Sequence, residues 1–516
     1  MGGSRRDWNF NHAFAQWFFG LGVELMPPLV PLGAAVGSLL ATTIIGSVTV
    51  GSLLTTVALS GVAYLLQSSS QANSTGGSAL DQGVQQTLQE PIYEERLIYG
   101  RALVAGRLFF YECKPPYLYL GLEIASHEID AIEQVQINGS VVTFSGAGAA
   151  TSKNFVSGAT PYAYMSARLG APGQALDPIL AADFAELPAS FKQQGHACVV
   201  MKCYYGTSAD DHNKFWGSGI PQVLFLCRGM KVFDERDATQ VQATPSTWKW
   251  SNNASLCIAH FLTFSRGMAR NWSDLDANYL MAAANHDDEG ISLVSGAVEK
   301  RYSINGVVNP NAAPADTLQQ MLTANLGDLI WSNGVYKIFS GVARTPTRTL
   351  NDDTARGDME VRTTRDRASL INLVRTVFVA PDRAYQTQNG PVLVNAAYQA
   401  ADGEAHEITL TLPFTSSATM AQRIAKATME RSRAGRTITR SESIDALRLE
   451  AADIITIDVG QLPALGGVFK VNKLAINQDT LEFQIEGEEY SPNWTAWSVA
   501  DEQPFIISPA ALAGVN

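Results

Sequence analysis

Cysteine is scarce in this chain of 516 residues, and so is charge, because only 17% of the residues are Asp, Glu, Lys or Arg. The five cysteines are an odd number at wide spacings, which excludes an evident disulfide framework or zinc pattern. Two of them, Cys198 and Cys203, lie in the apolar run Ala197–Tyr205, which predicts a strand. We therefore expect ordinary core thiols in a reducing compartment.

Recognisable catalytic motifs are also missing. The sequence has no G-x-S-x-G elbow, no H-E-x-x-H and no P-loop, and Gly146-Ala147-Gly148 lacks the third glycine of a dinucleotide loop. The dense acid and histidine clusters, His286–Glu289 and Asp210–His212, could bind a divalent metal, but such clusters are more often solvated loop charges. We assign no catalytic residue, no cofactor and no metal site, and we predict that the chain is not an enzyme.

Positive charge is in deficit. The net charge is −12 and the isoelectric point is about 5.1, which disfavours a protein whose main task is to grip phosphates. One basic run, Arg423–Arg440, could touch DNA. Because it lies in an acidic protein without interleaved aromatic residues, we expect a solvated helix face or a contact with carboxylates of another subunit.

The most unusual feature is a stretch from Leu25 to Leu80 that contains no charged residue. Its apolar part, 27–67, is long enough for two short membrane spans or a helical hairpin, and too long for a signal peptide. Gly33 and Gly37 have the spacing that lets helices approach closely. We predict a hydrophobic plug or membrane segment, buried in the assembly or inserted in a membrane, made of Leu32, Gly33, Gly37, Leu39, Leu40, Ile44, Ile45, Val48, Leu53, Leu54, Leu59, Val62, Leu65 and Leu66.

The remainder of the chain predicts mostly strands. Arg107–Tyr111 and Tyr117–Ile124 flank a turn at Lys114-Pro115-Pro116, and Ile132–Asn138 and Val141–Phe144 predict a hairpin. Strict alternation predicts strands in two further segments, Glu407–Phe414 and Leu481–Glu486.

Helices are fewer. Helical spacing favours Ala254–Phe264, Ala368–Val377 and the amphipathic Ala418–Arg433, with Met420, Ile424 and Met429 near one side. Ser273 and Asp276 resemble a capping box ahead of Tyr279–Asn285. The predicted fold class is α+β, mostly β, with several β-rich domains.

The order of these segments resembles the tip-attachment, or central hub, protein family of lambda-like long-tailed bacteriophages. The resemblance starts with PIYEERLIYGRALVAGRLFFYE and with the segment that carries Glu128, Ile129, Ile132, Val135, Ile137, Asn138 and Gly139. It continues in NNASLCIAHFLTFSRGMARNWSDLDANYLMAAANHDDE, RYSINGVV, GDLIWSNGVYKIFSGV, ITLTLPFTSSATMAQRIAKATMERSR, LEAADIITI and GGVFKV. Together these motifs cover about Pro91 to Trp497 in the family's order.

The sequence departs from the family pattern at three points. Ala452-Asp453 stands where the family has Gly-Asp, and Asn253-Ala254 where it has Asn-Pro. The sequence also ends soon after the matched region, where the family continues into fibronectin-like and receptor-binding modules. We therefore expect receptor binding to belong to other proteins.

The resemblance implies a trimeric ring that closes the distal end of a phage tail, with two tube-like β-barrel domains and assembly in the bacterial cytoplasm. It implies as partners a homotrimer, a distal tail ring protein, other tail tip or fibre proteins, the C-terminus of the tape measure protein and DNA that passes without specific binding. The host inner membrane is a further candidate, if the hydrophobic segment enters it.

The predicted organisation has seven regions. They are an aromatic arm (1–26), the hydrophobic helical segment (27–67), a linker (68–90), a first hub region (91–250), a helical region (251–310), a second tube-like region (311–400) and a C-terminal β-rich region (401–516). Two alternatives stay open. One is a cell-wall-degrading tail hydrolase, because paired carboxylates leave no sequence spacing to recognise. The other is a membrane-anchored cellular protein.

Overall fold

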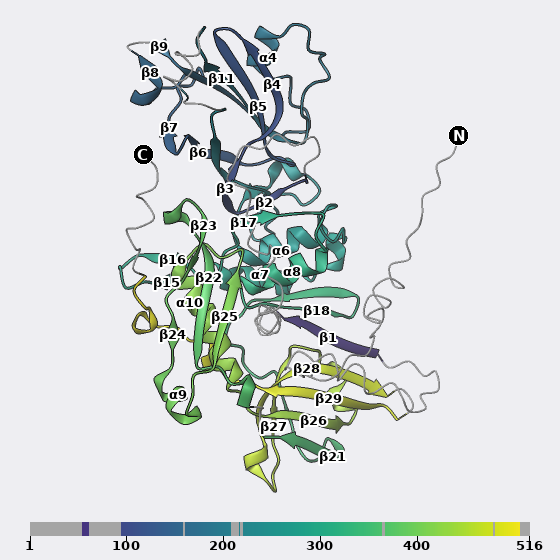
Figure 1. Ribbon diagram of the computed structural model, residues 1–516. Helices are drawn as coiled ribbons and strands as arrows, with labels where there is room; N and C mark the ends of the chain where they lie inside the picture. The colour runs from purple at the N-terminus through teal and green to yellow at the C-terminus, as the bar shows by residue number, and fades with distance from the viewer. Residues whose placement is uncertain are drawn as a thin grey trace, which may run out of the picture. The chain divides into compact units, whose positions relative to one another are not determined.

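The computed structural model describes residues 54–60, 94–157, 160–207, 216, 220–363, 367–477 and 480–505. All of them lie within one unit, Thr49–Asn516. Strands predominate, as predicted, and most of them are antiparallel (Figure 1).

The first half of the chain forms two four-stranded sheets that share one core. The order in one sheet is β10-β11-β5-β4, and in the other it is β3-β12-β6-β7. The helix α4 (Pro178–Asp183) packs on β11. The strand bounds are Arg101–Ala105 (β3), Arg107–Lys114 (β4), Tyr117–Ala125 (β5), Ala131–Ile137 (β6), Ser140–Val142 (β7), Ala163–Leu169 (β10), Ala197–Tyr204 (β11) and Val223–Arg228 (β12); β8 (Val156–Ser157) pairs with β9 (Thr160–Pro161).

The turns between these strands follow from their residues. Asn138 and Gly139 have φ values of 48° and 77°, which suits the tight turn of the β6–β7 hairpin. The predicted hairpin is confirmed, with the turn one residue earlier than expected. Gly100 lies so close to the Ile304 carbonyl oxygen that a Cβ would be 2.0 Å away, so a side chain has no room there.

A helical layer follows in the sequence. Its helices are α6 (Ala254–Thr263), α7 (Ala277–Asp287) and α8 (Pro314–Thr323). The capping box predicted at Ser273 and Asp276 is wrong: Asn271 and Asp274 form a capping box on the short 3-10 helix Trp272–Asp274, and Asp276 is itself the N-cap of α7. Short pairs surround the layer: β2 (Leu97–Tyr99) with β17 (Gly306–Val308), β13 (Lys231–Val232) with β14 (Lys249–Trp250), and β15 (Gly290–Ser292) with β16 (Val298–Lys300).

A third sheet packs against the long helix α10 (Ala418–Ser432). It contains β22 (Leu373–Ala380), β23 (Gln386–Asn389), β24 (Leu393–Val394) and β25 (Glu407–Leu412), and α9 (Ala396–Asp402) precedes β25. The helix predicted at Ala368–Val377 is wrong, because its start belongs to a short 3-10 helix, Arg367–Ser369, and its second half to strand β22. Its Val374 and Phe378 are buried, and β22 pairs along its length with β25, so tertiary pairing overrides the helical spacing.

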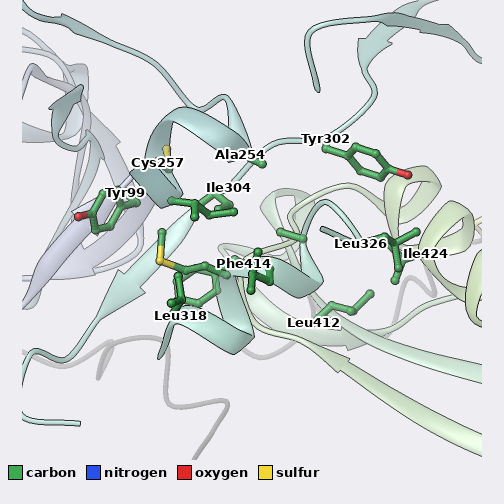
Figure 2. Packing of buried hydrophobic residues seen from close by; sticks show 14 of the residues in the cluster. Tyr99, Ala254, Cys257, Tyr302, Ile304, Leu318, Leu326, Leu412, Phe414 and Ile424 are labelled. Carbon is green, nitrogen blue, oxygen red and sulfur yellow. The ribbon is translucent and has the colours of Figure 1, made fainter. Parts of the chain in front are cut away.

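The largest core cluster joins the helical layer to this third sheet. Figure 2 shows Tyr99 from β2, Cys257 from α6, Leu318 from α8 and Ile424 from α10 in this one cluster. Cys198, Cys203, Cys227 and Cys257 are buried and unpaired, which confirms the prediction of core thiols for the first two.

The last sheet has nine strands, in the order β19-β18-β1-β28-β29-β26-β21, with β27 paired to β28 and β20 to β27. Their bounds are Leu54–Ser60 (β1), Asp328–Ser332 (β18), Val335–Phe339 (β19), Arg348–Leu350 (β20), Ala355–Arg362 (β21), Thr437–Glu442 (β26), Ile454–Ile457 (β27), Gly467–Asn477 (β28) and Glu482–Glu489 (β29).

Strand β1 comes from the segment predicted to be a helical hairpin. For Leu54–Ser60 the helix prediction is wrong, because these residues pair with β18 on one side and β28 on the other. The run Thr55-Thr56-Val57 is β-branched, which favours a strand. The remainder of the predicted hairpin lies outside the described residues.

We predict that Phe378→Ala lowers the free energy of unfolding by about 3–5 kcal/mol, because this ring is fully buried in the largest core cluster. Chemical denaturation of the full chain measures the effect. Val394→Ala in the same sheet is the control, because Val394 is 48% exposed and should change stability by less than about 0.5 kcal/mol. Equal losses in the two variants would contradict the assignment of this core.

Candidate functional site

Three cations of helix α10, Arg423, Lys426 and Arg431, form ion pairs with other parts of the chain. The hydroxyl of Ser417 accepts a hydrogen bond from the Met420 amide at 3.2 Å and starts the helix. Met420, Ile424 and Met429 are buried, as their spacing predicts. The helix is therefore packed against the core, and one of its cations, Arg423, is buried with it.

Six cations of the predicted basic run form ion pairs with carboxylates of the same chain. Arg423 contacts Glu299 at 2.6 Å, and its other guanidinium nitrogen donates to the Arg301 carbonyl at 2.8 Å. The further pairs are Lys426 with Asp501, Arg431 with Glu488, Arg433 with Asp402, Arg436 with Glu489 and Arg440 with Glu442.

The expectation of a solvated helix face is therefore wrong for Arg423 and Arg440, which are buried and paired within the chain. A contact with carboxylates of another subunit stays a prediction. Arg423 is 3% exposed and Arg440 is 2% exposed, and their carboxylate partners come from β16 and β26. Burying a charge is costly unless it is paired, so the run needs these internal carboxylates. The same pairing leaves little free positive charge to hold phosphates.

A second charged cluster links β18 to β28 through side chains. Lys470 of β28 contacts Asp328 of β18 at 2.7 Å, and Arg344 contacts the same carboxylate at 3.3 Å. Burial alone would raise the pKa of Asp328, but Lys470 and Arg344 outweigh it and lower the pKa to about 2. Burial lowers the pKa of Lys470 to about 8, against the opposite influence of Asp328.

The C-terminal segment covers this cluster. A cavity of about 50 Å³ is lined by the charged side chains and by Tyr490 and Trp494. The Tyr490 hydroxyl accepts a hydrogen bond from the Arg344 amide at 2.8 Å, and the Trp494 ring lies 5.8 Å from the Arg431 guanidinium. A volume of this size suits a few ordered waters rather than a substrate.

The cluster His286–Glu289 is structural. Asp287 is fully buried and accepts hydrogen bonds from the hydroxyls of Ser255 and Ser340, both at 2.5 Å. Burial raises its pKa to about 6 in spite of these bonds. In the described part of the chain no group of three or more His, Cys, Asp or Glu side chains could hold a metal. Asp210–His212 lies outside that part.

The predicted hydrophobic plug also lies largely outside the described residues. Of its fourteen members only Leu54 and Leu59 are described, and both belong to β1. Among the residues that the structure describes, no helix is long and apolar enough to cross a membrane. The membrane role of the segment stays a prediction.

Sequence reasoning missed the cluster around Asp328. The residues Asp328 and Lys470 are 142 positions apart, and nothing in their local sequence marks them as partners. The available signal was an acid near the start of the motif GDLIWSNGVYKIFSGV and a lysine in the motif GGVFKV, and such residues are common on solvated surfaces.

We predict that Arg423→Met lowers the free energy of unfolding by about 3 kcal/mol, because it removes the cation paired with Glu299 and leaves that carboxylate only the hydrogen bonds from Ser417 and Thr419. Chemical denaturation measures it. Arg362→Met is the matched control: that arginine is 74% exposed and pairs with an exposed Glu360, so the change should be below about 1 kcal/mol. A loss no larger than that of the control would show that the Arg423 pair contributes nothing.

We also predict an acid transition from Asp328. Its pKa is lower in the folded chain than the ordinary 3.8, so its stabilisation is fully present above pH 3.8 and is lost as the pH falls toward 2. The expected loss is about 2 kcal/mol, measured by denaturation at a series of pH values. Asp328→Asn should be less stable at neutral pH and should lack this part of the pH dependence. An unchanged acid profile in that variant would refute the assignment.

Comparison with known proteins relates the chain to phage tails. Residues 313–469 match the family described as putative phage tail protein, which is less than half of the chain. The matched segment contains α8, the third sheet, α10 and most of the nine-stranded sheet. Among proteins with curated descriptions, none matches.

Among solved structures, a chain of the virion of a native gene transfer agent particle is similar in fold. The TM-score is 0.55 at 18% identity, and the similarity covers 91% of this chain and 98% of the other. A tail protein from Neisseria meningitidis MC58 also matches, with a TM-score of 0.30, 9% identity and coverage of 78% and 98%. The fold is thus one that a virion chain adopts, and its central segment is similar to phage tail proteins.

Proposed function

We propose that this chain is a structural hub of a phage-type tail tip, which closes the distal end of the tail tube as a homotrimeric ring and opens for DNA ejection. Its role is assembly and passage rather than catalysis. The observation that carries the proposal is the match of residues 313–469 to phage tail proteins, because this segment supplies α10 and β18, β19, β20, β21, β26 and β27 of the nine-stranded sheet. The predicted motifs from Pro91 to Trp497 support it.

The nine-stranded sheet offers an edge for assembly. Among the described residues β21 pairs with β26 alone, so one side of β21 keeps unpaired backbone groups. An open sheet edge is a template for pairing with another chain. Three such sheets around an axis would form a continuous ring, with a distal tail ring protein above and a fibre or other tail tip protein below. The tape measure protein C-terminus would end at the same ring.

The electrostatics suit passage of DNA without tight binding. The net charge is −12, and carboxylates of the same chain neutralise the basic run on and after α10. A lumen lined by such a protein repels phosphates at long range and offers few free cations at short range. The proposal therefore treats DNA as a passing cargo.

The hydrophobic segment would plug the lumen before ejection and then enter the host inner membrane. Its length and freedom from charge support this role. The part of this segment that the structure describes, β1, pairs with strands of the nine-stranded sheet, which supports retention of the segment on the body in the proposed closed state.

We predict that the full chain forms a trimer. Light scattering should give the mass of three copies, and negative-stain images should show a ring with a central hole. The full chain is required, because a truncation that removed residues 1–80 would also remove β1. A charge substitution at the edge, Val361→Lys, should weaken assembly more than the same substitution at exposed Val241. A compact monomer in the presence of the neighbouring tail ring would overturn the hub proposal.

A further inference from the structure

The position of β1 in the nine-stranded sheet differs from that of its neighbours. Its residues 54–57 pair with residues 473–476 of β28, and its residues 58–60 pair with residues 328–330 of β18. Its first four residues thus lie on the edge of β28 and its last three on the edge of β18, and these two strands continue the sheet on their other sides, with β29 and β19. We call the position that β1 fills between them the slot. Residues 61–93 separate β1 from the next described residue, Glu94.

The two walls of the slot are held together without β1. Lys470 and Arg344 bind Asp328 and so tie β28 to the start of β18. Beyond the slot, Lys337 of β19 contacts the Glu450 carboxylate, and the Asn333 side chain donates to the same group at 2.8 Å.

Apolar contacts support the same junction. Ile330 of β18 packs against Ala451 and Ala452, and Phe339 of β19 adds to this small cluster. Arg344 also donates to the Ala452 carbonyl at 2.9 Å. The hairpin β18–β19 is therefore fixed to the β27–β28 part of the sheet by charged, polar and apolar contacts, none of which involves β1. The slot would keep its two edges in place if the strand left.

Without β1, the facing edges of β18 and β28 would stay in place and would carry unpaired backbone groups. Such edges accept an added strand. The length of chain on the C-terminal side allows the strand to leave, since residues 61–93 span up to roughly 100 Å when extended. On the N-terminal side, β1 is directly continuous with the uncharged apolar run from residue 27. The strand therefore connects that run to the body.

We propose that the slot between β18 and β28 is a docking site for a releasable strand, and that its occupant is the Leu54–Ser60 segment of the same chain. Docking retains the hydrophobic segment on the body. Withdrawal of β1 frees that segment and leaves the body folded. What the freed segment then does rests on the proposed function, whereas docking and release do not.

Hydrogen exchange within a single strand tests release. Residues 473–476 pair with β1 on one side and β29 on the other, and alternate amides point to each neighbour. If β1 withdraws from a folded body, the amides that face β1 should exchange about tenfold faster or more than those that face β29. The full chain is measured by mass spectrometry with residue-resolved fragmentation. Equally slow exchange on both sides would overturn the proposal, because β1 would then open only with the whole sheet.

A cysteine pair tests the occupant. Thr55 lies opposite Ala475, so Thr55→Cys with Ala475→Cys should form a disulfide within one chain on mild oxidation. The control is Thr55→Cys with Lys473→Cys, which is two residues out of register and should oxidise poorly. Peptide mapping of the non-reduced protein identifies the bond. No bond in the in-register pair, or a bond only between two copies, would overturn the proposed occupant.

The locked variant separates the inference from the proposed function. Oxidation should slow exchange of the β1-facing amides to the rate of the β29-facing amides, and reduction should restore the difference. A trimeric ring whose lock leaves exchange unchanged would overturn the docking strand and leave the hub standing. A monomer in which oxidation slows the β1-facing amides would support the docking strand and overturn the hub.

Discussion

The buried contact between Asp328 and Lys470 is the constraint on which the nine-stranded sheet depends. It joins a strand that follows the helical layer to a strand near the end of the chain, and so closes a long loop in the sequence. Two charges removed from water require each other, because either alone would cost several kcal/mol. Arg344 adds a second cation, so the carboxylate stays charged although it is buried. Backbone pairing of β27, β28 and β29 then fixes the remainder of the sheet around this point.

The same physical rule explains the surroundings of α10. An amphipathic helix in an acidic protein could have presented its cations to solvent, to another subunit or to DNA. The chain instead supplies carboxylates from four other elements or segments, namely β16, α9, β29 and the C-terminal segment. Buried charge pairs add little stability compared with apolar packing, but they penalise any alternative arrangement in which one partner is lost. These pairs fix α10 in orientation as well as in position. The third sheet and the nine-stranded sheet are thereby both attached to α10.

Local patterns in the sequence predict the local elements well. The strict alternation of Glu407–Phe414 and the helical spacing of Ala254–Phe264 and Ala418–Arg433 correspond to β25, α6 and α10. Ala368–Val377 fails because a short apolar run has no decisive period, and only its pairing with β25 makes it a strand. The partners of the basic run could not be predicted, because Glu299 and Asp402 become neighbours of α10 only through the tertiary fold. The domain boundaries and most of the hydrophobic segment remain predictions.

One departure from the hub-family pattern that the sequence resembles, at Ala452, has a structural cost that the fold offsets. Ala452, where the family has glycine, has a φ of 68°, a left-handed conformation that costs an alanine about 1 kcal/mol more than a glycine. The surrounding contacts outweigh this cost: the Ala452 amide donates to the Val471 carbonyl at 2.7 Å, its carbonyl accepts from Arg344, and its methyl group packs on Ile330. These are the contacts that hold β18 to β28 beside β1. The strain is thus tolerated at the junction that holds the two sides of the slot in place. The Ala452 methyl group also adds apolar contact there that a glycine could not provide.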